Sequence, residues 1–191
     1  MESFIPFKTD IDISNGKFLI SEPMLQDISF QKSVIFICHH DEDESIGYVI
    51  NKGCKQGLGN VVNDLNNIFF PLYIGGPVAQ DSLHFIHTMP QLLGGDVVDK
   101  EIYWGGDLET AIEQMKVGKI TAANCKFFLG YSGWSKGQLQ SELDLNAWLV
   151  ANASTPLLFE DREELIWKLT IEGLGAKYKP LLHVPLHAEF N

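Results

Sequence analysis

The chain has 191 residues, of which 45% are hydrophobic and 20% charged, so it can bury a sizeable core and does not have the composition of a disordered protein. Its formal net charge is −11, and Arg162 is the one arginine beside 13 lysines. Nucleic-acid affinity comes largely from Lys and Arg neutralising phosphates, and arginine is the usual reader of guanine. We therefore do not expect direct nucleic-acid binding.

The N-terminal residues, the apolar runs and the cysteine spacing together favour the cytoplasm. The N-terminal residues carry no basic region followed by a long apolar stretch, and no apolar run approaches the ~20 residues that span a bilayer. Cys38, Cys54 and Cys125 are odd in number and widely spaced, which argues against a disulfide framework or a zinc knuckle. We expect one domain, residues 1–191, in the cytoplasm and without membrane contact.

The first third of the chain predicts a polar arm and three strands. The arm spans residues 1–15 and is followed by a short strand over 16–20. Residues 34–38 form a continuous β-branched run, typical of a strand buried on both faces. The acidic segment 41–45 separates this run from a second one at 46–50, so we expect a hairpin with a solvent-facing acidic tip.

The middle of the chain predicts further strands and one well-marked helix. A short helix is expected over 58–65, and strands over 69–74, 83–87 and 102–104. Four apolar residues after Asp107 recur at helical spacing, namely Leu108, Ala111, Ile112 and Met115. Asp107 is placed to cap this helix and Gly118 to end it.

The last third predicts two strands, two helices and an irregular tail. The apolar run 127–131 and residues 148–150 read as strands, and Ser135 with Gln138 has the spacing of a capping box. Trp134 before this box and Leu139 after it are placed as a hydrophobic staple. A second box, Asp161 with Glu164, begins a helix that is expected to bury Leu165, Ile166 and Leu169. Residues 177–191 are expected to be irregular.

These elements predict an α/β fold of the α+β kind. Strand pairs outnumber helical crossovers, and glycine-rich corners recur between the strands. A mixed, strongly bent or bifurcated sheet flanked by about three helices fits this pattern better than a regular doubly wound sheet.

Several short motifs are spread along the chain between about residue 17 and residue 170. They are Phe18-Leu19-Ile20 with Pro23, Leu25 and Asp27; Ser33-Val34 with His40; Gly47 with Asn51-Lys52; Gly75-Gly76-Pro77-Val78; His87-Thr88; and Gly130-Tyr131-Ser132-Gly133-Trp134 with Gly137-Gln138-Leu139, Glu142 and Asn146-Ala147-Trp148. Taken together and in this order, these motifs resemble the YqgE/AlgH family of bacterial proteins.

The resemblance implies a compact α/β fold in which a bifurcated sheet rolls into a pseudo-barrel. One branch of the family is described as regulating transcription of alginate biosynthesis genes, and no catalytic residues carry over. Three positions depart from the commoner pattern: Ile28 and Gly53 stand where proline is frequent, and His39 stands where glutamate is frequent. The changes at residues 39 and 53 weaken any claim that the hairpin carries a shared ligand site.

Candidate metal ligands gather at His39 and His40, directly before the acidic tip. Imidazole and carboxylate groups together suit a divalent cation. Neighbouring residues on a strand point to opposite faces, so the two imidazoles cannot easily share one ion. His84 and His87 are separated in the same way, and we expect one of them to lie inside and bond a backbone group. We therefore assign no metal and no cofactor.

Candidate nucleophiles also have structural explanations. The segment around Ser132 resembles a nucleophile elbow, but Trp134 stands where the G-x-S-x-G pattern needs its second glycine. Cys38 lies in an apolar strand, where burial raises a thiol pKa and lowers reactivity. Gly75-Gly76-Pro77 lacks the lysine of a phosphate-binding loop and reads as a sharp corner.

We therefore favour a non-enzymatic regulatory or interaction protein with a protein or small-molecule partner. Its candidate ligand or partner surface comprises Gly75, Gly76, Pro77, His87, Ser132, Trp134 and Gln138. One alternative is a hydrolase or metal-assisted enzyme that uses His40, His87 or Ser132. Another is a small-ligand sensor with a pocket near Gly76, His87 and Trp134.

Overall fold

The computed structural model describes residues 7–25 and 27–184 of the chain. Its strands are β1 (Lys17–Ser21), β2 (Val34–His40), β3 (Glu44–Val49), β4 (Leu72–Ile74), β5 (Val78–His87), β6 (Asp96–Asp99), β7 (Ile102–Trp104), β8 (Cys125–Ser135) and β9 (Trp148–Asn152). Its α-helices are α1 (Pro90–Leu93), α2 (Leu108–Lys116), α3 (Gln138–Asp144), α4 (Thr155–Leu158) and α5 (Glu163–Gly173). Its 3₁₀ helices are η1 (Ile28–Phe30), η2 (Leu58–Asn60), η3 (Asn63–Leu65) and η4 (Ala176–His183).

One long strand, β8, joins the two halves of the sheet. The strand order is β6-β7-β5-β8-β3-β2-β1-β9, and β4 pairs with β8 in parallel beside this path. The first half of β8 pairs with β5 and β4, whereas Ser132–Ser135 pairs with β3. The sheet is therefore mixed, curled and split along β8, which confirms the predicted fold class.

The split occurs at Gly130, in the middle of β8. Its φ of +66° is a left-handed conformation, and a Cβ there would lie 2.6 Å from the carbonyl oxygen of Val78. Glycine lacks that Cβ, so β8 can bend while β5 stays in contact. The register between β5 and β8 also shifts between Val78 and Leu83, which adds to the bend.

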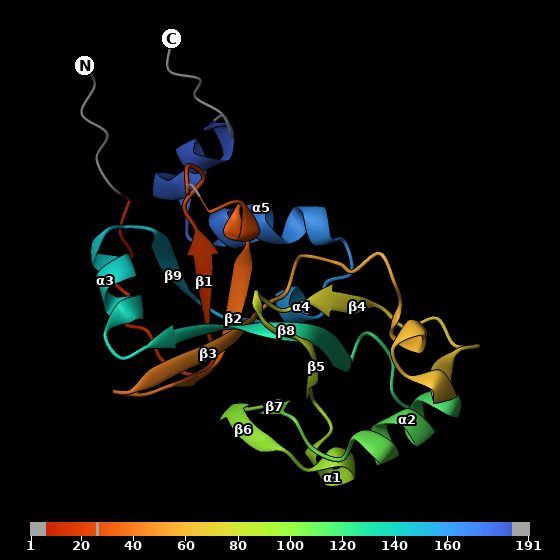
Figure 1. The fold of residues 1–191 in the computed structure, drawn as a ribbon. Coiled ribbons are helices and arrows are strands. Elements are labelled where there is room, and N and C mark those ends of the chain that lie inside the picture. Colours follow the sequence, from red (N-terminus) through yellow and green to blue (C-terminus); the bar gives the residue numbers. More distant parts are fainter. Residues whose placement is uncertain (1–6, 26, 185–191) are drawn as a thin grey trace, which may run out of the picture.

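The sheet is covered on both faces at its β1–β2 end, where alternate residues point to opposite sides. Phe18 and Phe36 pack in one cluster with Ile166 of α5, and Leu19 packs in another with Leu139 of α3. Figure 1 shows α5 above β1 and β2, and α3 beside β9. This double cover explains the uninterrupted apolar runs 18–20 in β1 and 34–38 in β2.

A third cluster lies at the β5 end of the sheet, around α1 and α2. Phe85 and Phe127 stack with ring centroids 5.1 Å apart and pack with Met115 of α2. As predicted, the side chain of Asp107 caps α2 by accepting a hydrogen bond from the Thr110 N–H at 3.1 Å. Figure 1 shows α1 and α2 at the end of the molecule away from α5.

Two helix starts differ from the capping boxes expected. Gly137, not Ser135, is the N-cap of α3, because β8 continues through Ser135; Gln138 Oε1 accepts the Ser135 N–H at 3.1 Å. Helix α5 begins after Arg162 without a side-chain cap. Ile166 is buried as predicted, but Leu165 and Leu169 are only partly buried, and the other buried residues are Trp167, Thr170 and Ile171.

Three further segments correct the sequence prediction. Residues 58–65 form the two 3₁₀ turns η2 and η3 in place of one short helix, and β4 is shorter than the run 69–74. Strand β6 was missed because Val97 and Val98 stand between aspartates at the sheet edge. The segment expected to be irregular from residue 177 is 3₁₀-helical through His183, and residues 185–191 lie outside the described residues. Within the described chain, no helix has the length and apolar content needed to cross a membrane.

Candidate functional site

Three depressions border one short segment, Asp27–Lys32, which contains the turn η1. The charged cavity, of about 780 Å³, includes Gln31 and Lys32 in its lining. The Pro77 pocket, of about 330 Å³, includes Ser29, and the tryptophan pocket, of about 300 Å³, includes Asp27 and Phe30.

The three depressions are neighbours that share lining residues. Lys52 lines both the charged cavity and the Pro77 pocket, and Pro77 lines both the Pro77 pocket and the tryptophan pocket. We call the three together the trench. It runs from α5 and η4, past the loop after β3, to the junction of β8, α3 and β9.

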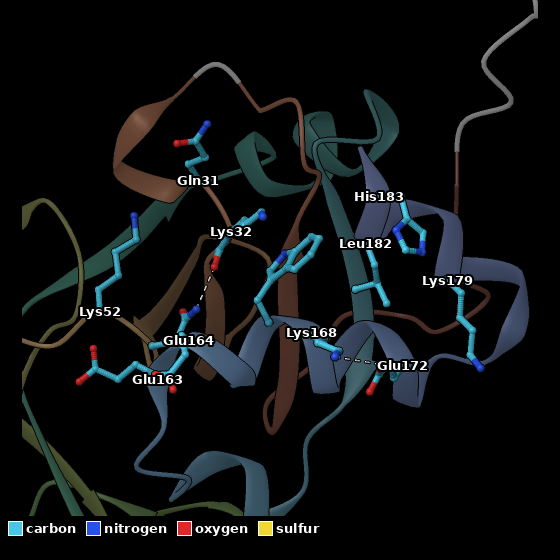
Figure 2. A pocket seen from close by; sticks show the side chains of 12 residues that line it. Gln31, Lys32, Lys52, Glu163, Glu164, Lys168, Glu172, Lys179, Leu182 and His183 are labelled. Atoms are coloured by element: carbon cyan, nitrogen blue, oxygen red, sulfur yellow. Dashed lines mark hydrogen bonds and ion pairs between the residues drawn. The ribbon is translucent and has the colours of Figure 1, made fainter. Parts of the chain in front are cut away.

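Both lysines and glutamates line the charged cavity, together with a tryptophan. These residues are Lys32, Lys52, Lys168 and Lys179; Glu163, Glu164 and Glu172; and Trp167. In Figure 2, Gln31 and Lys52 lie on one side, Lys179 and His183 on the other, and the Lys168–Glu172 pair between them. The lining carries one more lysine than glutamate, whereas the chain as a whole has a net charge of −11.

Lys52 and Asn51 attach the loop after β3 to the Asp27–Lys32 segment. The ammonium of Lys52 donates to the carbonyls of Ser29 and Ile28, and burial lowers its pKa. The side chain of Asn51 accepts from the Val34 N–H at 2.9 Å and donates to the Lys32 carbonyl at 2.8 Å. The wall between the charged cavity and the Pro77 pocket is thus held by four hydrogen bonds from two adjacent residues.

Helix α5 forms the opposite wall of the charged cavity. Trp167 is 5% exposed, and its indole N–H donates to the Ser21 carbonyl at 3.1 Å, which fixes the ring against β1. The Lys32 ammonium lies 5.4 Å from the centroid of this ring, within the range of a cation–π contact. The carboxylate of Glu163 accepts from the Gly53 N–H.

A carboxylate fixes two indoles at the far end of the trench. Oε2 of Glu142 accepts from the Trp134 indole at 2.9 Å and from the Trp148 indole at 2.7 Å. Its other oxygen, Oε1, accepts from the Gln138 amide at 3.0 Å. The two indoles are nearly buried and meet edge to face at 6.1 Å. Glu142 therefore holds α3, β8 and β9 together beside the tryptophan pocket.

Sequence comparison places the chain in a family. A family model described as AlgH-like matches residues 18–179. A UPF0301 protein of Cytophaga hutchinsonii is 35% identical over 181 residues, covering 94% of this chain and 100% of the relative. The chain belongs to the AlgH-like family. A UPF0301 protein of Bacteroides thetaiotaomicron is 36% identical over 179 residues, covering 93% of this chain and 91% of its own length.

Solved structures share the fold of this AlgH-like chain. The solution structure of the AlgH protein from Pseudomonas aeruginosa matches with a TM-score of 0.70 at 26% identity, covering 94% of this chain and 100% of that one. A crystal structure of a Corynebacterium diphtheriae protein matches with a TM-score of 0.76 at 20% identity, covering 90% and 92%. The second likeness shows the fold alone.

The trench contains four of the seven residues chosen from the sequence as a candidate surface. Gly76 and Pro77 line the Pro77 pocket, and Trp134 and Gln138 line the tryptophan pocket. Gly75 is the buried base of the corner, because its carbonyl accepts from the Val49 N–H at 2.9 Å and its Cα faces β8.

Ser132 and His87, the other two residues, lie elsewhere. Ser132 has no exposed surface, and its hydroxyl donates to the Gly75 carbonyl at 3.0 Å. His87 is also fully buried, and its Nε2 lies 2.9 Å from the Gly105 carbonyl oxygen, so it bonds the backbone as expected for one of the two histidines of β5. Burial lowers the pKa of His87. Neither residue is among the lining residues of the trench.

The other reactive side chains are also separated. His39 pairs with Asp41 at 3.0 Å, whereas His40 bonds the Ser45 hydroxyl at 2.7 Å and lines a different cavity. Among the described residues, no group of three histidine, cysteine, aspartate or glutamate side chains is arranged to hold a metal ion. Burial raises the pKa of Cys38.

Sequence reasoning did not select the charged cavity. Its residues come from the Asp27–Lys32 segment, the loop after β3, α5 and η4, and each group alone looks like an ordinary polar surface. Asn51-Lys52 was available as a signal because it belongs to the family motif. Glu163 gave no signal, since only the fold brings it to Gly53.

Proposed function

We propose that this AlgH-like protein is a non-enzymatic regulatory protein that binds a partner protein along the trench. The observation that supports this most is the adjacency of the three depressions, which share Lys52 and Pro77 as lining residues and together offer an extended surface rather than one closed pocket. An extended segment of a partner suits such a surface better than a compact substrate does. The regulatory part of the proposal rests on the family resemblance.

The chemistry of the trench also supports binding. Its charged side chains are mostly long lysines and glutamates, whose heads can pair with either sign of charge on a partner. The nucleophile candidates do not open into it: the Ser132 hydroxyl is engaged by Gly75, and His87 bonds Gly105. The net charge of −11 argues for a protein partner over a nucleic acid. We place this activity in the cytoplasm, in keeping with the sequence expectation.

A second candidate function is that of a small-ligand sensor. The charged cavity has a volume of about 780 Å³, within the range of ordinary small-molecule sites. A metabolite that binds only the native state raises the melting temperature, so a thermal-shift screen with anionic and zwitterionic metabolites tests this candidate. A stabilising compound whose effect disappears in Lys32→Glu would favour the sensor.

Site-specific photo-crosslinking in living cells tests the partner-binding proposal. A photoreactive phenylalanine analogue replaces Gln31 or Gln80 at the trench, and Glu113 on the exposed face of α2 in a control. We expect the same partner to be captured from both trench positions and not from residue 113. The transcript profile of a deletion strain should then be restored by the wild-type gene and not by a Lys52→Glu variant.

Two outcomes would contradict the proposal. One is crosslinking to partners from residue 113 alone, with none from residues 31 and 80. The other is turnover of a substrate by the purified protein that disappears in Ser132→Ala or His87→Ala while the fold is retained, since that would favour the hydrolase hypothesis.

A further inference from the structure

We propose that the tryptophan pocket is a receptor for a guanidinium group, supplied by an arginine side chain of the partner that binds the trench. This inference rests on the proposed function for the identity of the arginine's source, but the pocket itself can be tested alone.

The charge of the pocket selects a cation. Two charged side chains line it within the described chain, Asp27 from the N-cap of η1 and Glu142 from α3, and both are acidic. The nearest candidate to neutralise them from within is Lys52, but its ammonium donates to the carbonyls of Ser29 and Ile28 in the neighbouring pocket. In the described structure, neither carboxylate therefore forms a direct ion pair, although the Lys52 ammonium lies near enough to Asp27 to interact with its charge.

Each carboxylate keeps capacity to accept hydrogen bonds. Oδ1 of Asp27 accepts the Ser29 N–H at 2.8 Å, and among the described residues no donor reaches Oδ2. Oε1 of Glu142 receives one hydrogen bond, from Gln138, although a carboxylate oxygen has room for two. A guanidinium has five N–H donors in a planar fork, which matches two carboxylates on different elements better than a single ammonium does.

The walls of the pocket favour a flat cation. Phe30, Trp134, Trp148 and Pro77 are all among its lining residues. The ring of Trp148 meets Phe30 edge to face at 5.5 Å and Trp134 at 6.1 Å, so the three rings fix one another. A guanidinium is weakly hydrated and stacks on aromatic and apolar planes, here those of the partly exposed Phe30 and the exposed Pro77, whereas an ammonium is compact and strongly hydrated. Entry into a pocket of about 300 Å³ therefore costs the ammonium more.

The pocket is also preorganised before any ligand arrives. Glu142 Oε2 holds both indole N–H groups, which fixes the carboxylate and the two rings in one arrangement. Binding then orders few side chains, and this lowers its entropic cost. The indole N–H groups of Trp134 and Trp148 also report directly on the surroundings of Glu142, because both donate to its carboxylate.

Titration followed by ¹H–¹⁵N NMR of the indole N–H groups tests the inference on the full chain. The probes are N-acetyl-arginine amide, N-acetyl-lysine amide and N-acetyl-citrulline amide, the last being a neutral analogue with the shape of arginine. The signals are assigned with Trp134→Phe and Trp148→Phe. We expect the arginine probe to shift both indole signals saturably, the lysine probe to bind more weakly, and the citrulline probe to have no effect.

Asp27→Asn and Glu113→Gln form a matched pair of variants, since each removes one negative charge. Asparagine also caps helices, so Asp27→Asn should keep η1. The variant removes a charge-assisted hydrogen bond to the guanidinium, and this loss should weaken arginine binding about tenfold. Glu113 is exposed on α2 and its change should leave binding unaltered. Equal shifts with arginine and citrulline, no saturable shift, or equal binding by Asp27→Asn would each overturn the inference.

The crosslinking experiment separates this inference from the proposed function. Partner capture at residues 31 and 80 together with a failed arginine titration would overturn the guanidinium site alone. A positive titration without capture at the trench would overturn partner binding and leave the cation pocket standing.

Discussion

The carboxylate of Glu163 on α5 accepts a hydrogen bond from the backbone N–H of Gly53, with an O···N distance of 2.6 Å, between positions 110 residues apart. A Cβ at residue 53 would collide with the oxygens of this carboxylate. Glycine at this position therefore lets α5 approach the loop after β3 and close one wall of the charged cavity. The same loop supplies Lys52, which continues the wall into the Pro77 pocket.

Gly53→Ala should destabilise the protein through this contact. The new Cβ displaces the Glu163 carboxylate, and the loss of a charge-assisted hydrogen bond costs about 1–2 kcal/mol of unfolding free energy. Urea unfolding measures the change. Gly173→Ala is the control, because a Cβ there meets no atom within 4 Å. In a Glu163→Ala background the cost of Gly53→Ala should largely vanish, and an unchanged cost would show that the two residues are not coupled.

Glu142→Ala should destabilise the junction of α3, β8 and β9. Two nearly buried indole N–H groups, those of Trp134 and Trp148, would lose their acceptor. The expected loss is about 2–4 kcal/mol in the free energy of unfolding, measured by urea denaturation. Glu113→Ala on the exposed side of α2 should change it by less than about 0.5 kcal/mol. Equal effects of the two variants would mean that the Glu142 contacts contribute nothing net.

Lys126 should make the free energy of unfolding depend on pH in the alkaline range. Its ammonium is buried, donates to the Leu158 carbonyl at 3.1 Å and lies 4.1 Å from the Tyr73 ring centroid; burial lowers its pKa to about 7. Between this value and the unfolded pKa of about 10.4, the unfolded chain binds more protons than the folded one. The free energy of unfolding contributed by this residue therefore rises with pH across that window. Below pH 7 the folded protein bears the full cost of burying a charged ammonium.

Comparison with Lys126→Met isolates this effect, because the contributions of the other titrating groups to the pH dependence cancel in the difference between the two proteins. The difference in unfolding free energy, wild type minus variant, should rise between pH 7.5 and 9.5 with a slope approaching about 1.4 kcal/mol per pH unit. Chemical denaturation at several pH values measures it. A flat difference would mean that Lys126 titrates in the folded protein as an exposed lysine does.

The three cysteines should differ in reactivity. Cys38 and Cys125 are buried, and burial raises the pKa of both thiols, whereas Cys54 is partly exposed. Thiolate is the reactive form, so a disulfide reagent should modify one thiol quickly in the native protein and all three in denaturant. The fast reaction should disappear in Cys54→Ser. Fast modification of two or three native thiols would contradict the burial of β2 and β8.

Short-range patterns predicted much of the fold. The β-branched runs of β2 and β3 and the spacing of α2 from Asp107 depend on neighbours in sequence, and these elements form where expected. The start of α5 was misplaced because the Asp161–Glu164 spacing suits a cap, while packing of Trp167 against β1 sets the buried face. The bend of β8 at Gly130 depends on β5, which no local pattern reveals.

The candidate site was less predictable for the same reason. Pro77, Trp134 and Gln138 belong to family motifs and do line the trench. Ser132 belongs to the same motif, but it is buried and its hydroxyl donates to the Gly75 carbonyl, a contact with a residue 57 positions away that no local pattern reveals. The cavity between Lys32, Glu163 and Lys179 arises only when α5 and η4 pack beside the η1 segment.

Hydrogen–deuterium exchange of the protein with and without its captured partner tests the trench most directly. Partner binding along the trench predicts slower exchange in residues 27–32 and 51–53, with α2 (Leu108–Lys116) unchanged as the internal control. Slower exchange confined to α2 and its surroundings, with residues 27–32 and 51–53 unaffected, would contradict the assignment of the trench as the contact surface.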